Sequence, residues 1–284
     1  MDLWDQPKPP YASWGWDGPN TRDWHVAAQN TGNSILAKNP QWLIFIAGLG
    51  TNGWMGSDLG YVAYNPVKLS LPNQLVYETH EWSQDMYKQE YFSDPAYPRN
   101  LRGVWKSRWG YLQQNSISPV FIGAFDTNFD YPVPDHQWLG KFVNYMNGAF
   151  TSDNRSDLAL GQKGMSWAVG SSGIGILEAD FQTVKASLWS YISTSVAPIL
   201  SGPIPSSKLT VSPTSVPFLR PSKNPSAKPR TSGPSICPTI ARPTTNYPTV
   251  GSLVGQQVHS YFSVRGSQLV DGSGNTVRIA AVNW

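Results

Sequence analysis

The sequence predicts an α/β protein built on a parallel sheet. Two observations lead to this prediction: short apolar runs alternate with helical patterns over residues 1–200, and the runs are far enough apart for a crossover helix. Five runs have strand character: Met1–Gln6, Trp42–Ala47, Leu75–His80, Val120–Ala124 and Met165–Val169. Five strands with their helices make about five eighths of a closed (β/α)₈ barrel, so an incomplete barrel is expected.

Four helices are expected around these strands. The first begins near Asn20 or Thr21 and ends at Asn39-Pro40, because apolar residues recur at helical spacing between those points. The other three are expected over residues 99–114, 135–147 and 181–191. Residues 1–200 are therefore assigned to one partial barrel domain.

Residues 201–255 are predicted to form a disordered linker. The stretch 201–250 contains 11 Pro and 16 Ser or Thr, a composition that buries too little apolar surface to offset chain entropy. The remainder, 256–284, is expected to fold as two strands around a turn at Asp271–Asn275. We expect its second strand, Val277–Val282, to pair beside Met165–Val169, as the first and eighth strands do in a closed barrel.

Composition and charge exclude several classes of function. Outside residues 201–250, with their six Lys or Arg, 15 basic residues face 18 acidic ones, so there is no electrostatic footprint for nucleic acid. No apolar run is long enough to span a membrane, and the N-terminus lacks a signal-peptide pattern. The single cysteine, Cys237, allows no intrachain disulfide. Neither a metal site nor a cofactor site is predicted, since the histidines are scattered and the Gly170–Gly175 loop lacks the dinucleotide-binding spacing.

Several motifs point to a family when they are taken in order. Leu3-Trp4-Asp5-Gln6-Pro7 opens the series. The others are the stretches 23–28, 39–45, 72–77, 109–112 and 180–184. Over about 190 residues this series resembles the cellulase branch of glycoside hydrolase family 5. Tyr261–Trp284 resembles the opening of the same catalytic domain, its N-terminal hairpin and first barrel strand, so the chain is similar to the tail of one copy joined to the head of another. A circular permutation is the other arrangement that fits this order.

The resemblance implies that the positions of the family's two catalytic glutamates are occupied by other residues in this chain. The acid/base of its Asn-Glu-Pro motif falls on Gln6, and the nucleophile of its Gly-Glu-Phe-Gly-Thr motif falls on Ala124. An amide has no proton to give at useful pH, and a methyl group has no nucleophilic atom. The resemblance therefore implies a hydrolase fold that lacks both acids of its mechanism.

Neighbouring residues complete the expected site. His80-Glu81-Trp82 matches a His-x-Tyr motif of the family, so His80 is retained and Trp82 replaces the tyrosine. Two carboxylates adjoin the lost glutamates: Asp126, expected on the same face as Ala124, and Asp5, expected to face away from Gln6 in a strand. The resemblance implies that Trp54, Trp82 and Trp167 are the substrate-binding aromatics.

Three functions remain open on these residues. The first is an inactive glycoside hydrolase fragment. The second is a non-catalytic β-glucan-binding protein whose stacking tryptophans come from Trp14, Trp16, Trp54, Trp82 and Trp167. The third is a hydrolase that uses displaced carboxylates or is completed by another chain. The resemblance implies a β-glucan partner and an extracellular location.

Overall fold

A computed structural model describes most of the chain outside residues 201–260. The described residues are 1–15, 22–50, 57–127, 134–148, 165–170, 176–178, 180, 182–192, 194 and 261–283. All of them belong to one compact unit, Met1–Ser201 with Val258–Trp284. The predicted linker, Cys237 and two of the predicted sugar-binding tryptophans, Trp16 and Trp54, lie outside the described residues.

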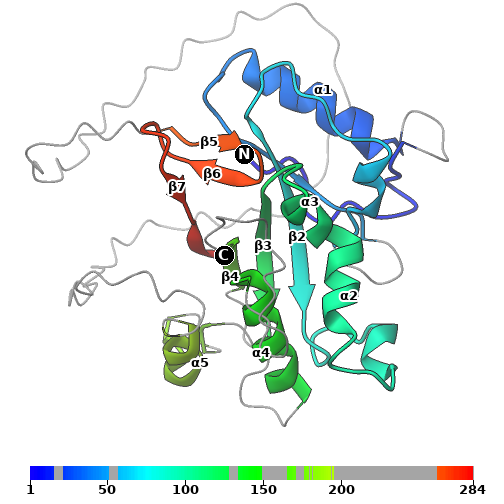
Figure 1. The fold of residues 1–284 in the computed structure, drawn as a ribbon, viewed down its shortest axis with the longest axis vertical. Coiled ribbons are helices and arrows are strands. Elements are labelled where there is room, and N and C mark those ends of the chain that lie inside the picture. Colours follow the sequence, from blue (N-terminus) through cyan, green and yellow to red (C-terminus); the bar gives the residue numbers. More distant parts are fainter. Residues whose placement is uncertain are drawn as a thin grey trace, which may run out of the picture. The chain divides into compact units, whose positions relative to one another are not determined.

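A five-stranded parallel sheet forms the centre of this unit (Figure 1). Its strand order is β1-β2-β3-β4-β8, and every neighbouring pair is parallel. The strands are β1 (Ile44–Ala47), β2 (Leu75–Trp82), β3 (Val120–Asp126), β4 (Ser166–Gly170) and β8 (Ala280–Asn283). The prediction of an α/β protein with a parallel sheet is confirmed.

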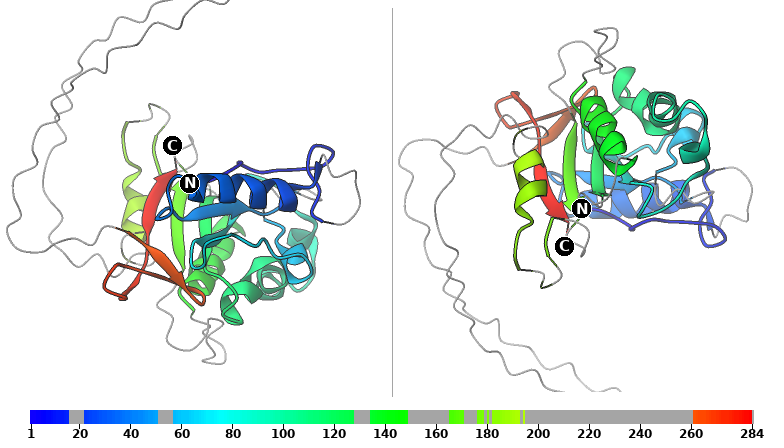
Figure 2. Two further views of the ribbon diagram at one scale, coloured as in Figure 1. Left: turned by 90° about the horizontal axis from the view of Figure 1, so that it is seen from above. Right: turned by 90° about the horizontal axis from the view of Figure 1, so that it is seen from below.

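The last strand pairs with β4, as the sequence predicted. Trp167 lies opposite Ala280 and Val169 opposite Val282 in a parallel register. The backbone N–H of Ile279 also donates to Ser166 Oγ at 2.9 Å. Figure 2 shows the red C-terminal strand alongside the green strands of the sheet.

A small antiparallel sheet precedes β8. It contains β5 (Ser263–Arg265), β6 (Gln268–Val270) and β7 (Thr276–Val277) in sequence order. The turn predicted at Asp271–Asn275 is confirmed, and the Asp271 carboxylate accepts from the backbone N–H groups of Ser273 and Asn275. The first of the two strands expected around this turn is divided, because a turn with Gly266 at φ +62° separates β5 from β6. The antiparallel β5–β6 pair and the later strand β8 correspond to the hairpin and barrel strand that the resemblance implies. The second predicted strand is divided between two sheets: β7 belongs to the small antiparallel sheet and β8 to the parallel sheet.

The strand predicted at Met1–Gln6 is absent. This segment makes one isolated parallel bridge, between Asp2 and Phe45. The backbone then leaves the extended conformation at Gln6, whose φ is +49°. A positive φ in a residue other than glycine is uncommon and has no strong sequence signature.

The helices follow the predicted pattern with shifted ends. They are α1 (Trp24–Leu36), α2 (Leu101–Trp105), η4 (Lys106–Gly110), α3 (Tyr111–Gln114), α4 (Pro134–Met146) and α5 (Ala186–Tyr191). Two short 3₁₀ turns, η2 (Gly60–Ala63) and η3 (Glu90–Ser93), lie in the loops after β1 and β2. The α2–η4–α3 run replaces a single predicted helix and contains a π turn. The α5 helix begins later than predicted because Val184 pairs with Leu177.

The two faces of the sheet pack into different hydrophobic clusters. On one face, residues from all five α-helices join side chains such as Ile44, Ile122 and Trp167 in a large core. On the other face, Val76, Phe45 and neighbouring side chains pack against Leu269 and other residues of the segment 264–279. None of the described helices combines the length and apolar character that a membrane span requires.

A buried carboxyl group joins β2 to the α2–η4 run on the helix-covered face. Trp105 Nε1 donates to Glu81 Oε2 at 3.1 Å, and Trp109 Nε1 donates to Oε1 at 2.7 Å. Burial raises the pKa of Glu81 to about 8, against the lowering effect of the two indole hydrogen bonds. Both buried indoles thereby gain an acceptor.

Candidate active site

The candidate site lies where β2 and β3 approach their carboxyl ends, next to the segment that contains Gln6. In parallel α/β sheets this end of the strands carries the functional side chains. His80 pairs in register with Ala124, and its ring nitrogen Nδ1 lies 3.0 Å from Gln6 Nε2. The two positions of the predicted catalytic glutamates are therefore brought to the same histidine, although 118 residues separate them in the chain.

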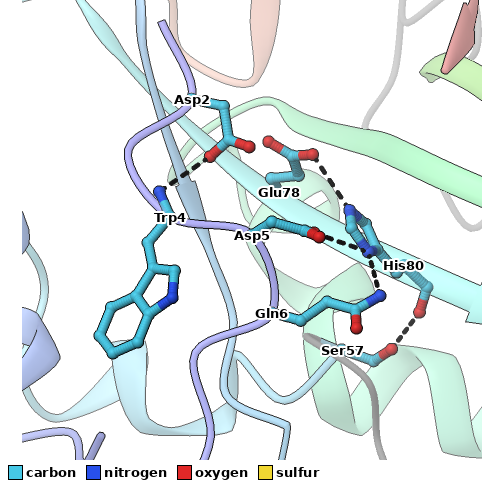
Figure 3. A network of polar contacts seen from close by, with 7 residues as sticks. All are labelled: Asp2, Trp4, Asp5, Gln6, Ser57, Glu78 and His80. Atoms are coloured by element: carbon cyan, nitrogen blue, oxygen red, sulfur yellow. Dashed lines mark hydrogen bonds and ion pairs between the residues drawn. The ribbon is translucent and has the colours of Figure 1, made fainter. Parts of the chain in front are cut away.

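Asp5 and Gln6 approach His80 from the same side (Figure 3). Asp5 Oδ1 lies 3.6 Å from His80 Nδ1, and the Asp5 side chain is 72% exposed. The expectation that Asp5 faces away from Gln6 was wrong. It assumed an extended strand, in which neighbours alternate between faces, and the positive φ at Gln6 breaks that alternation.

The position of the predicted nucleophile is buried and bears only a methyl group. Ala124 is 2% exposed. The register between β2 and β3 shifts here, since Thr79 pairs with Ile122 and His80 pairs with Ala124. This irregularity turns Ala124 to the same face of the sheet as His80.

A carboxylate that was not among the predicted site residues lies beside His80. Glu78 Oε1 is 3.2 Å from His80 Nε2, and Glu78 is 5% exposed. Glu78 and His80 are two residues apart on β2, so their side chains share one face. That spacing within a predicted strand was the signal that could have identified Glu78.

A second carboxyl group next to Glu78 has a shifted pKa. Much of Asp2 is exposed, yet partial burial of its carboxyl group and the nearby charge of Glu78 raise its pKa to about 6. Asp2 Oδ1 accepts from the backbone N–H of Trp4 at 3.3 Å. Asp2 and Glu78 are thus two carboxyls close to each other on the site face.

Trp82 and Asp126 extend the site beyond His80. They pair with each other in register, which places Asp126 on the face that Ala124 occupies. The Trp82 ring meets the His80 ring edge-on, with 6.1 Å between centroids. Asp126 is 2% exposed.

Two of the predicted sugar-binding tryptophans belong to the core. Trp167 pairs in register with Ile122 and packs against Phe125 at 5.9 Å, on the face opposite His80. Trp14 is also buried, and its Nε1 donates to the backbone oxygen of Asn65. Trp4, which was not among the predicted sugar-binding residues, is 42% exposed, precedes Asp5 and contacts Trp24 edge-on.

No metal site is found within the described part of the chain, where no three His, Cys, Asp or Glu side chains are grouped to hold an ion. A pocket of about 560 Å³ lies away from His80, where β1 begins. Its walls are mainly apolar and consist of Met1, Gln41, Trp42, Leu43, Phe45, Tyr261, Phe262 and Ile279. The pocket therefore does not coincide with the site.

Comparisons with known proteins agree with this architecture. An endoglucanase from Paenibacillus polymyxa is 41% identical over 143 residues, which cover 48% of this chain and 36% of that protein. The major extracellular endoglucanase of Xanthomonas campestris pv. campestris is 28% identical over 155 residues, 51% of this chain and 31% of that one. The chain thus spans about a third of the length of these relatives.

Solved structures give the same result. An endocellulase from Pyrococcus horikoshii, crystallised in complex with cellotetraose, superimposes with a TM-score of 0.53 at 29% identity. The match covers 66% of this chain and 55% of the endocellulase. The model of the cellulase family, glycosyl hydrolase family 5, matches residues 4–158, more than half of the sequence. The chain therefore belongs to glycosyl hydrolase family 5, the cellulase family.

Proposed function

We propose that this chain keeps a cellulase-type site for β-glucan but does not hydrolyse glycosidic bonds by the retaining mechanism of its family. The observation that supports this proposal is the convergence of Gln6 and Ala124 on His80. Retaining hydrolysis needs two carboxyl groups about 5–5.5 Å apart, one to protonate the leaving oxygen and one to attack the sugar. An amide and a methyl group supply neither function.

The remaining carboxylates argue against a simple replacement. Glu78 and Asp5 approach opposite nitrogens of His80, so the imidazole ring stands between them. Asp2 neighbours Glu78 on its other side and shares the same negative surroundings. Asp126 is the carboxylate best placed to act instead, because it follows Ala124 on the same face. An experiment on activity must therefore include Asp126.

Binding of β-glucan without turnover is the function that these residues still support. Trp4 is half-exposed beside Asp5, Trp82 lies against His80, and the Gln6 amide can hydrogen-bond a sugar. Aromatic faces and amides bind sugars without any need for a proton donor. The relatives are endoglucanases, and one solved neighbour holds cellotetraose. Secretion is part of the same proposal, since one relative is named as extracellular.

The chain organisation is also a proposal. We propose that residues 1–200 form an incomplete (β/α)₈ barrel, that 201–255 act as a disordered Pro/Ser/Thr spacer, and that 256–284 are the start of a second catalytic-domain copy. The pairing of β8 with β4 supports the assignment of 256–284 to the start of a catalytic domain, because the first and eighth strands are neighbours in such barrels. The Pro and Ser/Thr content supports the spacer.

An activity assay tests the proposal directly. The whole chain, incubated with carboxymethyl cellulose, is expected to release no more reducing sugar than a blank, with the P. polymyxa endoglucanase as positive control. The double variant Gln6→Glu with Ala124→Glu restores both carboxyls, and activity in the double variant alone would show that these two losses cause the inactivity. Turnover by the parent chain would contradict the proposal, and its loss in Asp126→Asn would identify the replacement.

A binding assay tests the second half. The chain is expected to sediment with insoluble cellulose, and Trp4→Ala with Trp82→Ala should weaken this retention. Tyr64→Ala is the matched control, because Tyr64 is 74% exposed on a different loop. Equal retention of both variants would show that the candidate site does not hold the glucan.

A further inference from the structure

Glu78 has a contact that the proposed function does not use. It is a buried carboxylate whose Oε1 lies 3.2 Å from His80 Nε2. A carboxylate can only accept a hydrogen bond from the ring, and this contact selects the imidazole tautomer that carries hydrogen on Nε2. Figure 3 shows Glu78 and Gln6 on opposite sides of the ring.

The tautomer has a consequence at the other nitrogen. A neutral imidazole with hydrogen on Nε2 has a lone pair on Nδ1, so Nδ1 accepts. Gln6 Nε2, at 3.0 Å, then donates to it. This fixes the side-chain amide of Gln6 with its nitrogen toward His80 and its oxygen away from the ring.

Asp5 approaches His80 on the side of Gln6, opposite Glu78, and competes with Glu78 for the ring proton. Its carboxylate is 3.6 Å from Nδ1 and would favour hydrogen there. Asp5 is 72% exposed and Glu78 is buried, and water screens the exposed charge far more strongly. The shorter, buried contact therefore decides the tautomer.

Glu78 occupies this place because residue 123 has no side chain. A Cβ atom added at Gly123 would overlap the Glu78 carboxyl group. Gly123 adjoins the register shift beside Ala124. The carboxyl group of Glu78 on β2 therefore fills the space that a side chain at position 123 on β3 would occupy.

We propose that Glu78 is a positioning residue, which fixes the tautomer of His80 and through it presents the amide oxygen of Gln6 to a hydroxyl group of the ligand. The ligand in this statement rests on the proposed function, β-glucan binding. The proposal goes further by naming how the sugar is recognised: Gln6 accepts from a hydroxyl group, and does not act chiefly as a donor to the glycosidic oxygen.

Nuclear magnetic resonance of the ¹⁵N-labelled whole chain tests the tautomer. At pH 8, where imidazoles are ordinarily neutral, long-range ¹H–¹⁵N spectra separate protonated from bare ring nitrogens, and His80→Asn assigns the signal. The parent chain is expected to carry hydrogen on Nε2. Glu78→Gln should give a mixture of tautomers, because its amide can donate or accept. Hydrogen on Nδ1 in the parent, or no change in Glu78→Gln, would overturn the proposal.

A second variant reaches the same contact from β3. Gly123→Ala should displace the Glu78 carboxyl group and shift the tautomer as Glu78→Gln does, while Glu90→Gln, an exposed change of the same chemistry, should leave it unaltered. A merely structural role for Glu78 would lower the melting temperature without this shift. An unchanged tautomer in a folded Gly123→Ala chain would also contradict the proposal.

Calorimetry with cellotetraose tests the link to the ligand. Loss of one ordered hydrogen bond should weaken binding about fivefold in Glu78→Gln and leave Glu90→Gln at the parent value. Equal affinities would overturn the link between Glu78 and ligand recognition. No binding by the parent would defeat the proposed function, whereas the tautomer measurement would still decide the role of Glu78.

Discussion

Two glutamates three residues apart on β2 have opposite surroundings. Glu78 lies on the site face, where its partner is the ring of His80. Glu81 lies on the helix-covered face, where Trp105 and Trp109 each donate an indole N–H to it. The first contact joins residues of the same strand, whereas the second joins a strand to a helical run.

The difference shows which changes the fold can accept. Gln6 and Ala124, at the predicted positions of the catalytic glutamates, are an amide and a methyl group, and each still has a partner: Gln6 contacts His80, and Ala124 pairs with His80 in the sheet. Removal of Glu81 would leave two buried indole N–H groups without their acceptor, which is costly. A substitution at Glu81 is therefore expected to cost more stability than one on the site face, and this comparison can be tested on both faces.

The largest effect is expected from pH acting on Glu81. Its pKa is about 8 in the folded chain, whereas a glutamate exposed to water has a pKa near 4.5. Because the fold favours the protonated form, the contribution of Glu81 to stability is greatest below about pH 4.5 and is lost as the pH rises toward 8. Each unit of pKa difference corresponds to about 1.4 kcal/mol, so the loss should reach several kcal/mol.

Urea unfolding between pH 6 and 9 measures this slope. Asp2 contributes a slope of the same sign at lower pH, since its pKa is raised to about 6, and starting at pH 6 reduces that contribution. Glu81→Gln should be nearly flat over this range. A parent chain as flat as Glu81→Gln would show that Glu81 is ionised at no cost.

Truncation of Glu81 should have the next largest effect. At pH 6, Glu81→Ala is expected to lower the free energy of unfolding by about 3 kcal/mol, because it creates a cavity and leaves two indole donors unsatisfied. Glu90→Ala is the exposed control and should change stability by less than about 0.5 kcal/mol. Similar losses of unfolding free energy in the two variants would show that the buried contacts of Glu81 stabilise the chain no more than an exposed glutamate does.

A glycine of the η4 run offers a smaller test of the helix-covered face. A Cβ atom at Gly110 would overlap the Tyr145 hydroxyl group, so Gly110→Ala should cost about 1–3 kcal/mol. Gly103→Ala on α2 meets nothing within 4 Å and should stabilise the chain by about 0.5–1 kcal/mol. Thermal unfolding of the two variants gives the sign. Stabilisation by both would mean that Tyr145 moves aside freely.

The smallest effect is expected at Asp5. Its carboxylate is 72% exposed and 3.6 Å from His80, so Asp5→Asn should change the free energy of unfolding by less than about 0.5 kcal/mol. A loss above about 1 kcal/mol would show that the site face also depends on a charge pair. Asp5, and not Glu78, would then be the carboxylate that determines the state of His80.

Much of the sheet could be predicted from the sequence, because apolar runs bounded by loop residues indicate parallel strands. The runs at Trp42–Ala47, Leu75–His80 and Val120–Ala124 correspond to β1, β2 and β3 with ends shifted by two residues or fewer. The pairing of β8 with β4 was also predicted correctly, because it follows from barrel closure and not from local sequence.

The site was predicted less completely. The convergence of Gln6, Ala124 and His80 followed from motif order, but the positive φ at Gln6 did not, since nothing in its side chain requires that conformation. The face of Trp167 also escaped prediction, because tryptophan suits a core and a sugar platform equally well. Glu78 was not predicted because it lies outside the family motifs, and only the alternation of side chains within β2 places it beside His80.

The pairing of β8 with β4 has a consequence for the nascent chain during its synthesis. The contacts between Met165–Ser166 and Arg278–Ile279 join residues 113 positions apart. At ordinary translation rates of about 5–20 residues per second, these 113 residues take roughly 6–23 seconds to synthesise, and β4 lacks its neighbour β8 for that time. During that interval β4 has an unpaired edge, to which the strand of another chain can add, so the late arrival of β8 exposes the chain to aggregation.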